Sequence, residues 1–269
     1  MKSHGIRFGS VCLKVFTLVY LGGLVIVPLL YLLKQAFAPG WNVNFTESRD
    51  QYALAALVNT LLITFVTLCI TIPFGIMTAF VLVRDRFPGR DLWNGVVDLP
   101  FAAPAAIGAF ALLITYGPRG MLGPLLETAG FQIMFALPGM VLATVFVTLP
   151  FVIREVAPLL EEMGREAEEA ARTLGASRAQ TIFHITIPNL REGILYGAAQ
   201  SYARALGEFG AVLAVSGNIL GKTQTTPLYI YDAYIDFRME AAYTAAALLV
   251  ALSLGGMALL ELWKRRWRA

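Results

Sequence analysis

Two charged residues, Arg204 and Glu208, interrupt an apolar stretch at residues 193–215 that is long enough to cross a membrane. They stand four positions apart, so a helix places them on one face, with the polar side chains of Gln200 and Ser201 nearby. Charges inside a membrane face the protein interior or an aqueous path. The forked guanidinium of Arg204 suits a tetrahedral oxyanion. Two interpretations stand: the four residues line a translocation path for an anion, or Arg204 and Glu208 form a structural pair.

A second group of charges lies in residues 154–192, which hold five basic and seven acidic side chains. This density places the segment in water or against another protein, not in lipid. Glu161 with Arg165, and Glu168 with Arg172, are acid-before-base pairs at i,i+4, which favour a helix. The first half of the segment is therefore predicted to be helical.

Gly175 predicts the end of that helix, because glycine readily adopts the left-handed conformation found there. Ser177 can cap a second short helix over residues 178–185, which we expect to end near Pro188. Two short helices joined at a glycine and lying parallel to the membrane would make a rigid projection between two spans.

The composition shows which elements must position these residues. Hydrophobic residues make up 57% and charged residues 14% of the 269 positions, against about 45–50% and 25% in soluble domains. A net charge of +3 gives no sign of nucleic-acid binding. Cys12 and Cys69 are single residues in apolar runs, so we expect neither a disulfide nor a metal site.

The sequence predicts an all-α membrane protein, one transmembrane domain over residues 1–269 with about six transmembrane helices. The long second stretch must tilt, protrude or kink at Pro73. The third stretch is the weakest prediction of a span, because prolines interrupt its backbone hydrogen bonds. The six stretches are residues 15–33, 53–83, 99–117, 131–153, 193–215 and 241–260.

The distribution of Lys and Arg predicts the orientation. Fifteen of the 21 basic residues fall in the two termini, the loop after the second span and the loop at residues 154–192. Cytoplasmic loops carry this excess, so we expect both termini and that large loop in the cytoplasm.

The large loop also carries a motif that resembles the EAA loop of the membrane subunits of ABC importers. The only departure is Ile187 where that pattern has Leu, a volume-conserving change. The resemblance implies a coupling helix that sits in a groove of an ATP-binding subunit and passes its closure to the membrane helices. The matching residues are Glu169, Ala170, Ala171, Gly175, Ile185 and Pro188.

The resemblance to importer permeases runs from about residue 53 to 262. Residues 131–135, 150–152 and 204–211 are similar to sulfate/thiosulfate permeases of the CysW type. The resemblance implies a permease subunit, without catalysis or cofactor, that moves sulfate or thiosulfate across the cytoplasmic (inner) membrane. It implies contact with membrane lipid and three kinds of protein partner. These are two ATP-binding-cassette ATPase subunits, a second, related but different permease chain, and an external sulfate-binding protein.

Three alternatives remain at this point. Molybdate and tungstate permeases share the block at residues 204–211, and these oxyanions are also tetrahedral dianions. A secondary anion transporter or channel would leave the coupling loop without a purpose. A membrane-embedded enzyme such as a lipid phosphatase would need clustered His, Asp or Ser at a membrane face, and the chain has only two histidines.

Overall fold

The computed structural model describes residues 13–38 and 51–268, and within them every regular element is helical. This confirms the all-α prediction. Within the described ranges, four continuous helices are long and apolar enough to cross a membrane. They are Leu13–Phe37, which includes η1 (Gly22–Ile26) and α2 (Val27–Phe37), α4 (Gln51–Arg84), α8 (Leu137–Glu162) and α14 (Met239–Arg268).

The third predicted span is a bent pair of helices. The chain bends by 111° between α5 (Arg90–Ala102) and α6 (Ala105–Tyr116). Ala103 and Pro104 are extended between them, and Pro104 has no N–H with which to continue the α5 ladder. The bend therefore follows from the proline that made this span the weakest prediction.

The fifth predicted span is divided in two. α11 (Ile187–Leu206) ends before Gly207, and α12 (Gly210–Ser216) begins after a break. Beyond Glu192, α11 rises only about 21 Å before it ends, less than the ~30 Å hydrocarbon core. By length and composition, the described residues thus hold four continuous candidate spans and one bent candidate, where about six spans were predicted.

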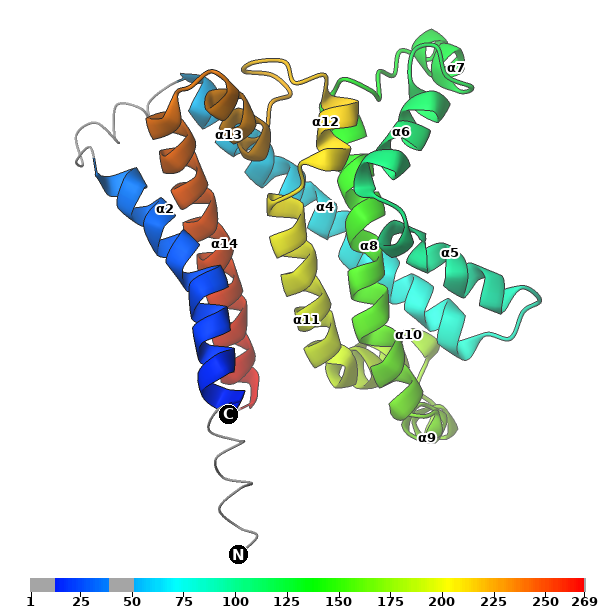
Figure 1. The fold of residues 1–269 in the computed structure, drawn as a ribbon. Helices are drawn as coiled ribbons and strands as arrows, with labels where there is room; N and C mark the ends of the chain where they lie inside the picture. The colour runs from blue at the N-terminus through cyan, green and yellow to red at the C-terminus, as the bar shows by residue number, and fades with distance from the viewer. Residues whose placement is uncertain (1–12, 39–50, 269) are drawn as a thin grey trace, which may run out of the picture.

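The long second span is one helix. Pro73 lies inside α4 without ending it, and the 34 residues rise about 51 Å. Figure 1 shows α4 running at a slant behind α8, which is the tilt expected of a helix longer than the membrane is thick.

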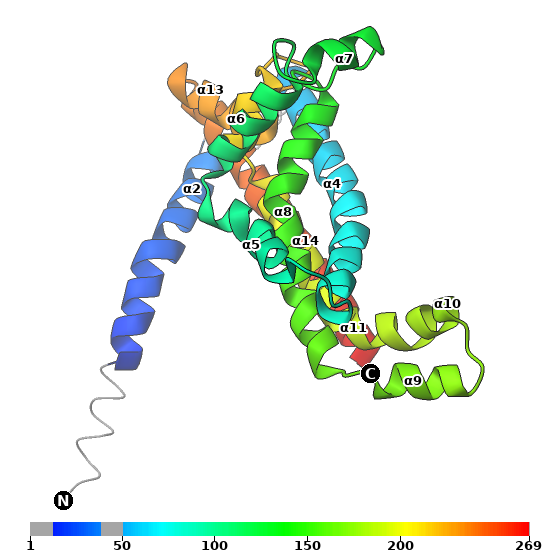
Figure 2. The same cartoon turned by 90° about the vertical axis from the view of Figure 1, so that its right-hand side faces the viewer.

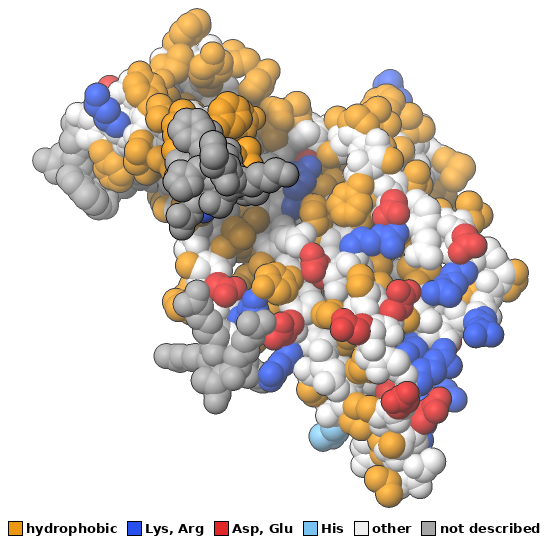
Figure 3. Space-filling model, turned by 60° about the horizontal axis from the view of Figure 1, so that its bottom comes forward, with side chains coloured by type: hydrophobic (Ala, Val, Ile, Leu, Met, Phe, Trp, Pro, Cys, Tyr) orange, Lys and Arg blue, Asp and Glu red, His pale blue; other side chains and the backbone are white. Residues whose placement is uncertain are grey.

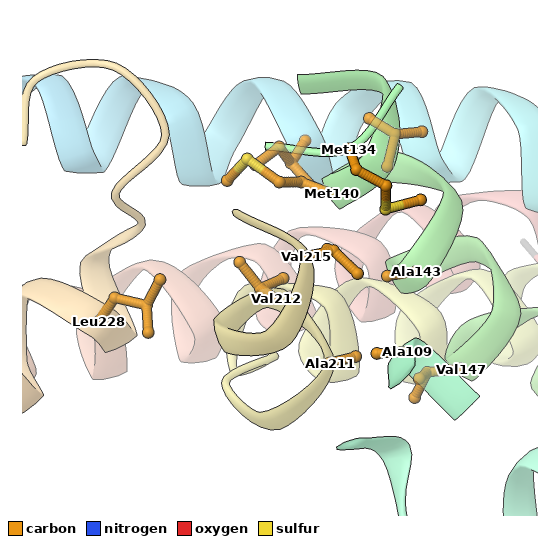
Figure 4. Close-up of a cluster of buried hydrophobic side chains, with 11 residues drawn as sticks. Ala109, Met134, Met140, Ala143, Val147, Ala211, Val212, Val215 and Leu228 are labelled. Atoms are coloured by element: carbon orange, nitrogen blue, oxygen red, sulfur yellow. The ribbon is translucent and has the colours of Figure 1, made fainter. Parts of the chain in front are cut away.

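Helix α8 is the centre of the bundle, because α4 and α11 both pack along it. One buried cluster joins α8 to α6, α12 and α13; Figure 4 shows its side chains, among them Met140, Val212 and Leu228. A second cluster joins α8 to α4 and α11 through residues such as Val152 and Leu190. The outer pair α2 and α14 lies beside this bundle (Figure 1).

Glycines let three helices approach closely at Val152 of α8. A Cβ added to Gly75 of α4 would lie 2.7 Å from the Cβ of Val152, and one on Gly197 of α11 would lie 2.8 Å from its Cα. Real Cβ atoms essentially never come this close, so a side chain at either position would force Val152 or its helix to shift.

The remaining helices are short and lie near the two ends of the bundle (Figures 1 and 2). α7 (Gly123–Thr128) and α13 (Thr226–Ile235) lie at one end. The opposite end carries α9 (Glu166–Thr173), α10 (Arg178–Thr181) and the π-helical turn η2 (Ile182–Thr186).

Gly197→Ala tests the close packing. The added methyl meets the backbone of Val152, which cannot yield as a flexible side chain can, so we expect a loss of about 1–3 kcal/mol of stability. The thermal unfolding midpoint of the purified protein in detergent measures it. Gly255→Ala is the matched control, a mid-helix glycine of α14 with open space around it, and it should leave the midpoint unchanged or raised. Equal midpoints for the two variants would contradict this packing.

Candidate functional site

The predicted coupling loop projects from the bundle as two arms. Figure 2 shows α9 and α10 side by side and turned away from the long helices. Figure 3 shows acidic and basic side chains intermingled over this end of the molecule. Such a surface is suited to water or a protein partner, as expected for residues 154–192.

Gly175 ends α9 as the sequence predicts. Its φ is +91°, and its N–H donates to the carbonyl of Arg172 at 3.0 Å, while the N–H of Ala176 donates to that of Ala171 at 3.0 Å. These two bonds form a Schellman motif, the helix ending in which glycine avoids a Cβ penalty. The reversal between the two arms thus depends on a residue that can adopt a left-handed conformation.

The second arm begins as predicted but does not end near Pro188. Ser177 and Gln180 form a capping box at the start of α10. The chain then continues through η2 into α11, and Pro188 lies in the first turn of that helix. The N–H of Ile187 donates to the carbonyl of Ile182, five residues back. This wide turn brings the chain into α11 at Pro188, which has no N–H to donate.

The acid–base pairs predicted within the first arm do not form. α8 ends at Glu162, and Gly164 turns the chain with a φ of +64°. Glu161 instead pairs with Arg90 at 3.8 Å, and Glu168 pairs with Arg84 at 3.2 Å. The helix break separates Glu161 from Arg165, because i,i+4 partners need an unbroken helix. Glu168 and Arg172 do share α9, but Glu168 pairs with Arg84 of α4 instead.

The motif residues lie on the surface of the two arms. Glu169, Ala170, Gly175 and Pro188 are exposed, whereas Ala171 and Ile185 are half-buried. At the tip, Leu174 has 89% of its surface exposed beside Gly175. A small, charged helix with an apolar tip is a surface that another protein can approach closely.

Arg204 and Glu208 form an ion pair of 2.7 Å. Glu208 lies in the break after α11, where it is 1% exposed, while the side chain of Arg204 is 36% exposed. The other oxygen of Glu208 accepts a hydrogen bond from the N–H of Ala211 at 2.8 Å and so caps α12. The carboxylate therefore links the two helices of the broken span.

Gln200 and Ser201 do not join this pair. Gln200 donates to the carboxylate of Glu155 at 2.6 Å, and Ser201, fully buried, donates to the carbonyl of Thr148 at 3.2 Å. Both partners belong to α8, so these side chains fasten α11 to α8. The predicted set of four polar residues is thus divided between two tasks.

Sequence reasoning missed two residues at the base of the loop, Arg84 and Thr186, both of which contact Glu168. The sequence signal for Arg84 was a positive charge at the end of a long apolar span, and the signal for Thr186 was its place within the motif. Among the described residues, no group of three or more His, Cys, Asp or Glu could hold a metal ion.

Comparison with known proteins identifies the family. The family described as "Binding-protein-dependent transport system inner membrane component" matches residues 71–269. The sulfate transport system permease protein CysW of Synechococcus elongatus is 44% identical over 250 residues, which cover 93% of this chain and 87% of that protein. The sulfate transport system permease protein CysT of Salmonella typhimurium is 37% identical, covering 86% of this chain and 83% of that protein.

A solved structure confirms the fold. A chain of a bacterial alginate ABC transporter, in complex with a periplasmic protein that holds an alginate pentasaccharide, superposes with a TM-score of 0.82. It is 19% identical and covers 98% of this chain and 96% of its own length. Members of the matched family are non-catalytic, multi-pass components of the inner membrane. The chain therefore belongs to the permease subunits of ABC importers and, within them, to the family of CysW-type sulfate permeases.

Proposed function

We propose that this chain forms part of the path by which sulfate and thiosulfate cross the inner membrane in an ATP-driven importer. The observation that carries the proposal is the similarity to a CysW-type sulfate permease at 44% identity over nearly the whole chain. An external sulfate-binding protein delivers the anion in this account, in keeping with a binding-protein-dependent system.

Two ATP-binding subunits supply the energy through the loop of α9, α10 and η2. The exposed face of Glu169 and Ala170 and the exposed tip at Leu174 support this role, because small side chains permit close approach and an apolar tip gains by burial. The excess of basic residues around this loop and at both termini supports a cytoplasmic position for all three.

The second permease chain is a related but different subunit. Similarity to permeases of two names, CysW and CysT, supports a pair of unlike chains. Such a pair buries the polar path between two helical bundles, where charges avoid lipid.

Molybdate or tungstate is the alternative solute, because the block at residues 204–211 resembles permeases of those oxyanions as well. A competition experiment decides between the solutes. The chain is reconstituted in vesicles with its ATPase, second permease and binding protein, and uptake of labelled sulfate is measured. We expect competition by unlabelled sulfate and thiosulfate, and uptake only when ATP is available to the ATPase. Uptake of labelled molybdate without uptake of labelled sulfate would assign the other solute, and uptake without ATP would indicate a secondary transporter or channel.

Two variants decide whether the ion pair of Arg204 and Glu208 is structural or contributes to the anion path. Arg204→Leu leaves a buried carboxylate without its cation, so the level of the protein in the membrane should fall. Arg204→Leu combined with Glu208→Gln removes both charges, while the amide oxygen can still cap α12, so the level should recover.

Uptake by the double variant separates the two interpretations. If the pair is structural, uptake of sulfate recovers with the protein level, and this is the result we expect. If Arg204 instead offers its charge to the passing anion, the double variant accumulates normally but does not import sulfate. The guanidinium that would attract the dianion is still absent in this variant. Membrane protein level and sulfate uptake are measured on the same vesicles.

A further inference from the structure

Three side chains from separate parts of the chain meet at the base of the loop. Arg84, the last residue of α4, contacts a carboxylate oxygen of Glu168 in α9 at 3.2 Å. The same oxygen accepts a hydrogen bond from the hydroxyl of Thr186, at the end of η2, at 3.0 Å. We call these three residues the loop junction.

The loop junction is buried. The side chains of Arg84 and Glu168 are 14% and 10% exposed, and Thr186 is fully buried. Breaking a buried ion pair is costly, because loss of either partner leaves an uncompensated buried charge.

Backbone contacts extend the loop junction to the turn that precedes α9. Arg84 also donates to the carbonyl of Gly164, and Arg165 donates to the carbonyl of Arg84. The end of α4 is thus bound to both the start and the middle of the first arm.

Helix α9 has little else to hold it in place. Its sequence consists of Glu, Ala, Arg and Thr, and Glu168 is its buried residue. Glycines with positive φ, Gly164 and Gly175, flank the helix on either side. Because α9 buries no large apolar side chain, the polar contacts of Glu168 fix its direction relative to α4 and α11.

We infer that the loop junction is the positioning device through which α9 moves as one body with the ends of α4 and α11. This inference rests on the proposed coupling role of the loop. A displacement of α9 by an ATPase subunit then reaches α4 through Arg84 and α11 through Thr186. Glu169, the next residue along α9, is exposed, so one helix turn contacts the partner on one side and the bundle on the other.

The chain offers a matched control. Arg90 and Glu161 also form an Arg–Glu pair between helices at this end, yet the atoms are 3.8 Å apart and the side chains are 37% and 63% exposed. Exposed ion pairs of this kind contribute little to the stability of the fold. Removing the control pair changes the same charges without touching the loop junction.

The test uses the full complex in vesicles and counts ATP hydrolysed per sulfate imported. Arg84→Leu with Glu168→Leu removes the loop junction without leaving a lone buried charge, and Thr186→Val removes the hydroxyl alone. We expect both to raise the ATP-to-sulfate ratio by roughly threefold or more, while the ATPase subunits still co-purify. Thr186→Ser, which keeps the hydroxyl, and the double change Arg90→Leu with Glu161→Leu should retain the original ratio.

An unchanged ratio in Thr186→Val, or in the assembled double variant, would overturn the inference. Thr186→Val keeps the ion pair, so it gives an answer even where the double variant does not accumulate. Failure of the proposed function is a separate result: the unaltered chain would then neither co-purify with the ATPase subunits nor import sulfate with them.

Discussion

The backbone of α11 can approach α8 closely at Val152 only because residue 197 is glycine, and Gly75 gives α4 the same closeness. The rest of the architecture depends on this contact. It makes α8 the centre of a three-helix core, and α8 leads directly into the loop through Gly164. The same three helices therefore meet again at the loop, where α4 ends and η2 leads into α11. The chain joins the loop to α8 and α11, and Arg84 joins it to α4.

Polar contacts fasten the helices at both ends of the bundle. At the loop end, Arg84 binds Glu168, and Arg154 of α8 makes a two-bond pair with Asp98 of α5 at 2.8 and 2.7 Å. At the opposite end, the neutral side chain of Asn59 donates to two backbone carbonyls of the loop before α13. Ion pairs at the loop end give α9 a direction that apolar burial does not supply.

Composition and spacing predicted the helical membrane fold, the glycine ending of α9 and the cap at Ser177, because each follows from local chemistry. They did not predict where the helices break. Pro104 produced a sharp bend between α5 and α6. Pro188 did not end the second arm, because a π-helical turn precedes it and the chain continues into α11. Partners distant in sequence were also missed: Glu168 has an equally suitable local partner at i+4, and only the folded bundle brings Arg84 to it. The coupling role of the motif came from resemblance and not from spacing alone.

The most direct test of the account is the accessibility of the loop tip. Leu174 is replaced by cysteine in a chain whose own cysteines are serine, with Lys222→Cys, in the exposed part of the opposite loop, as the control. An impermeant thiol reagent should miss position 174 in intact cells, label it in permeabilised cells that lack the ATPase subunits, and label it far less when those subunits are present. Position 222 should react in intact cells in both backgrounds. Labelling of position 174 from outside, or equal labelling with and without the ATPase subunits, would contradict the account.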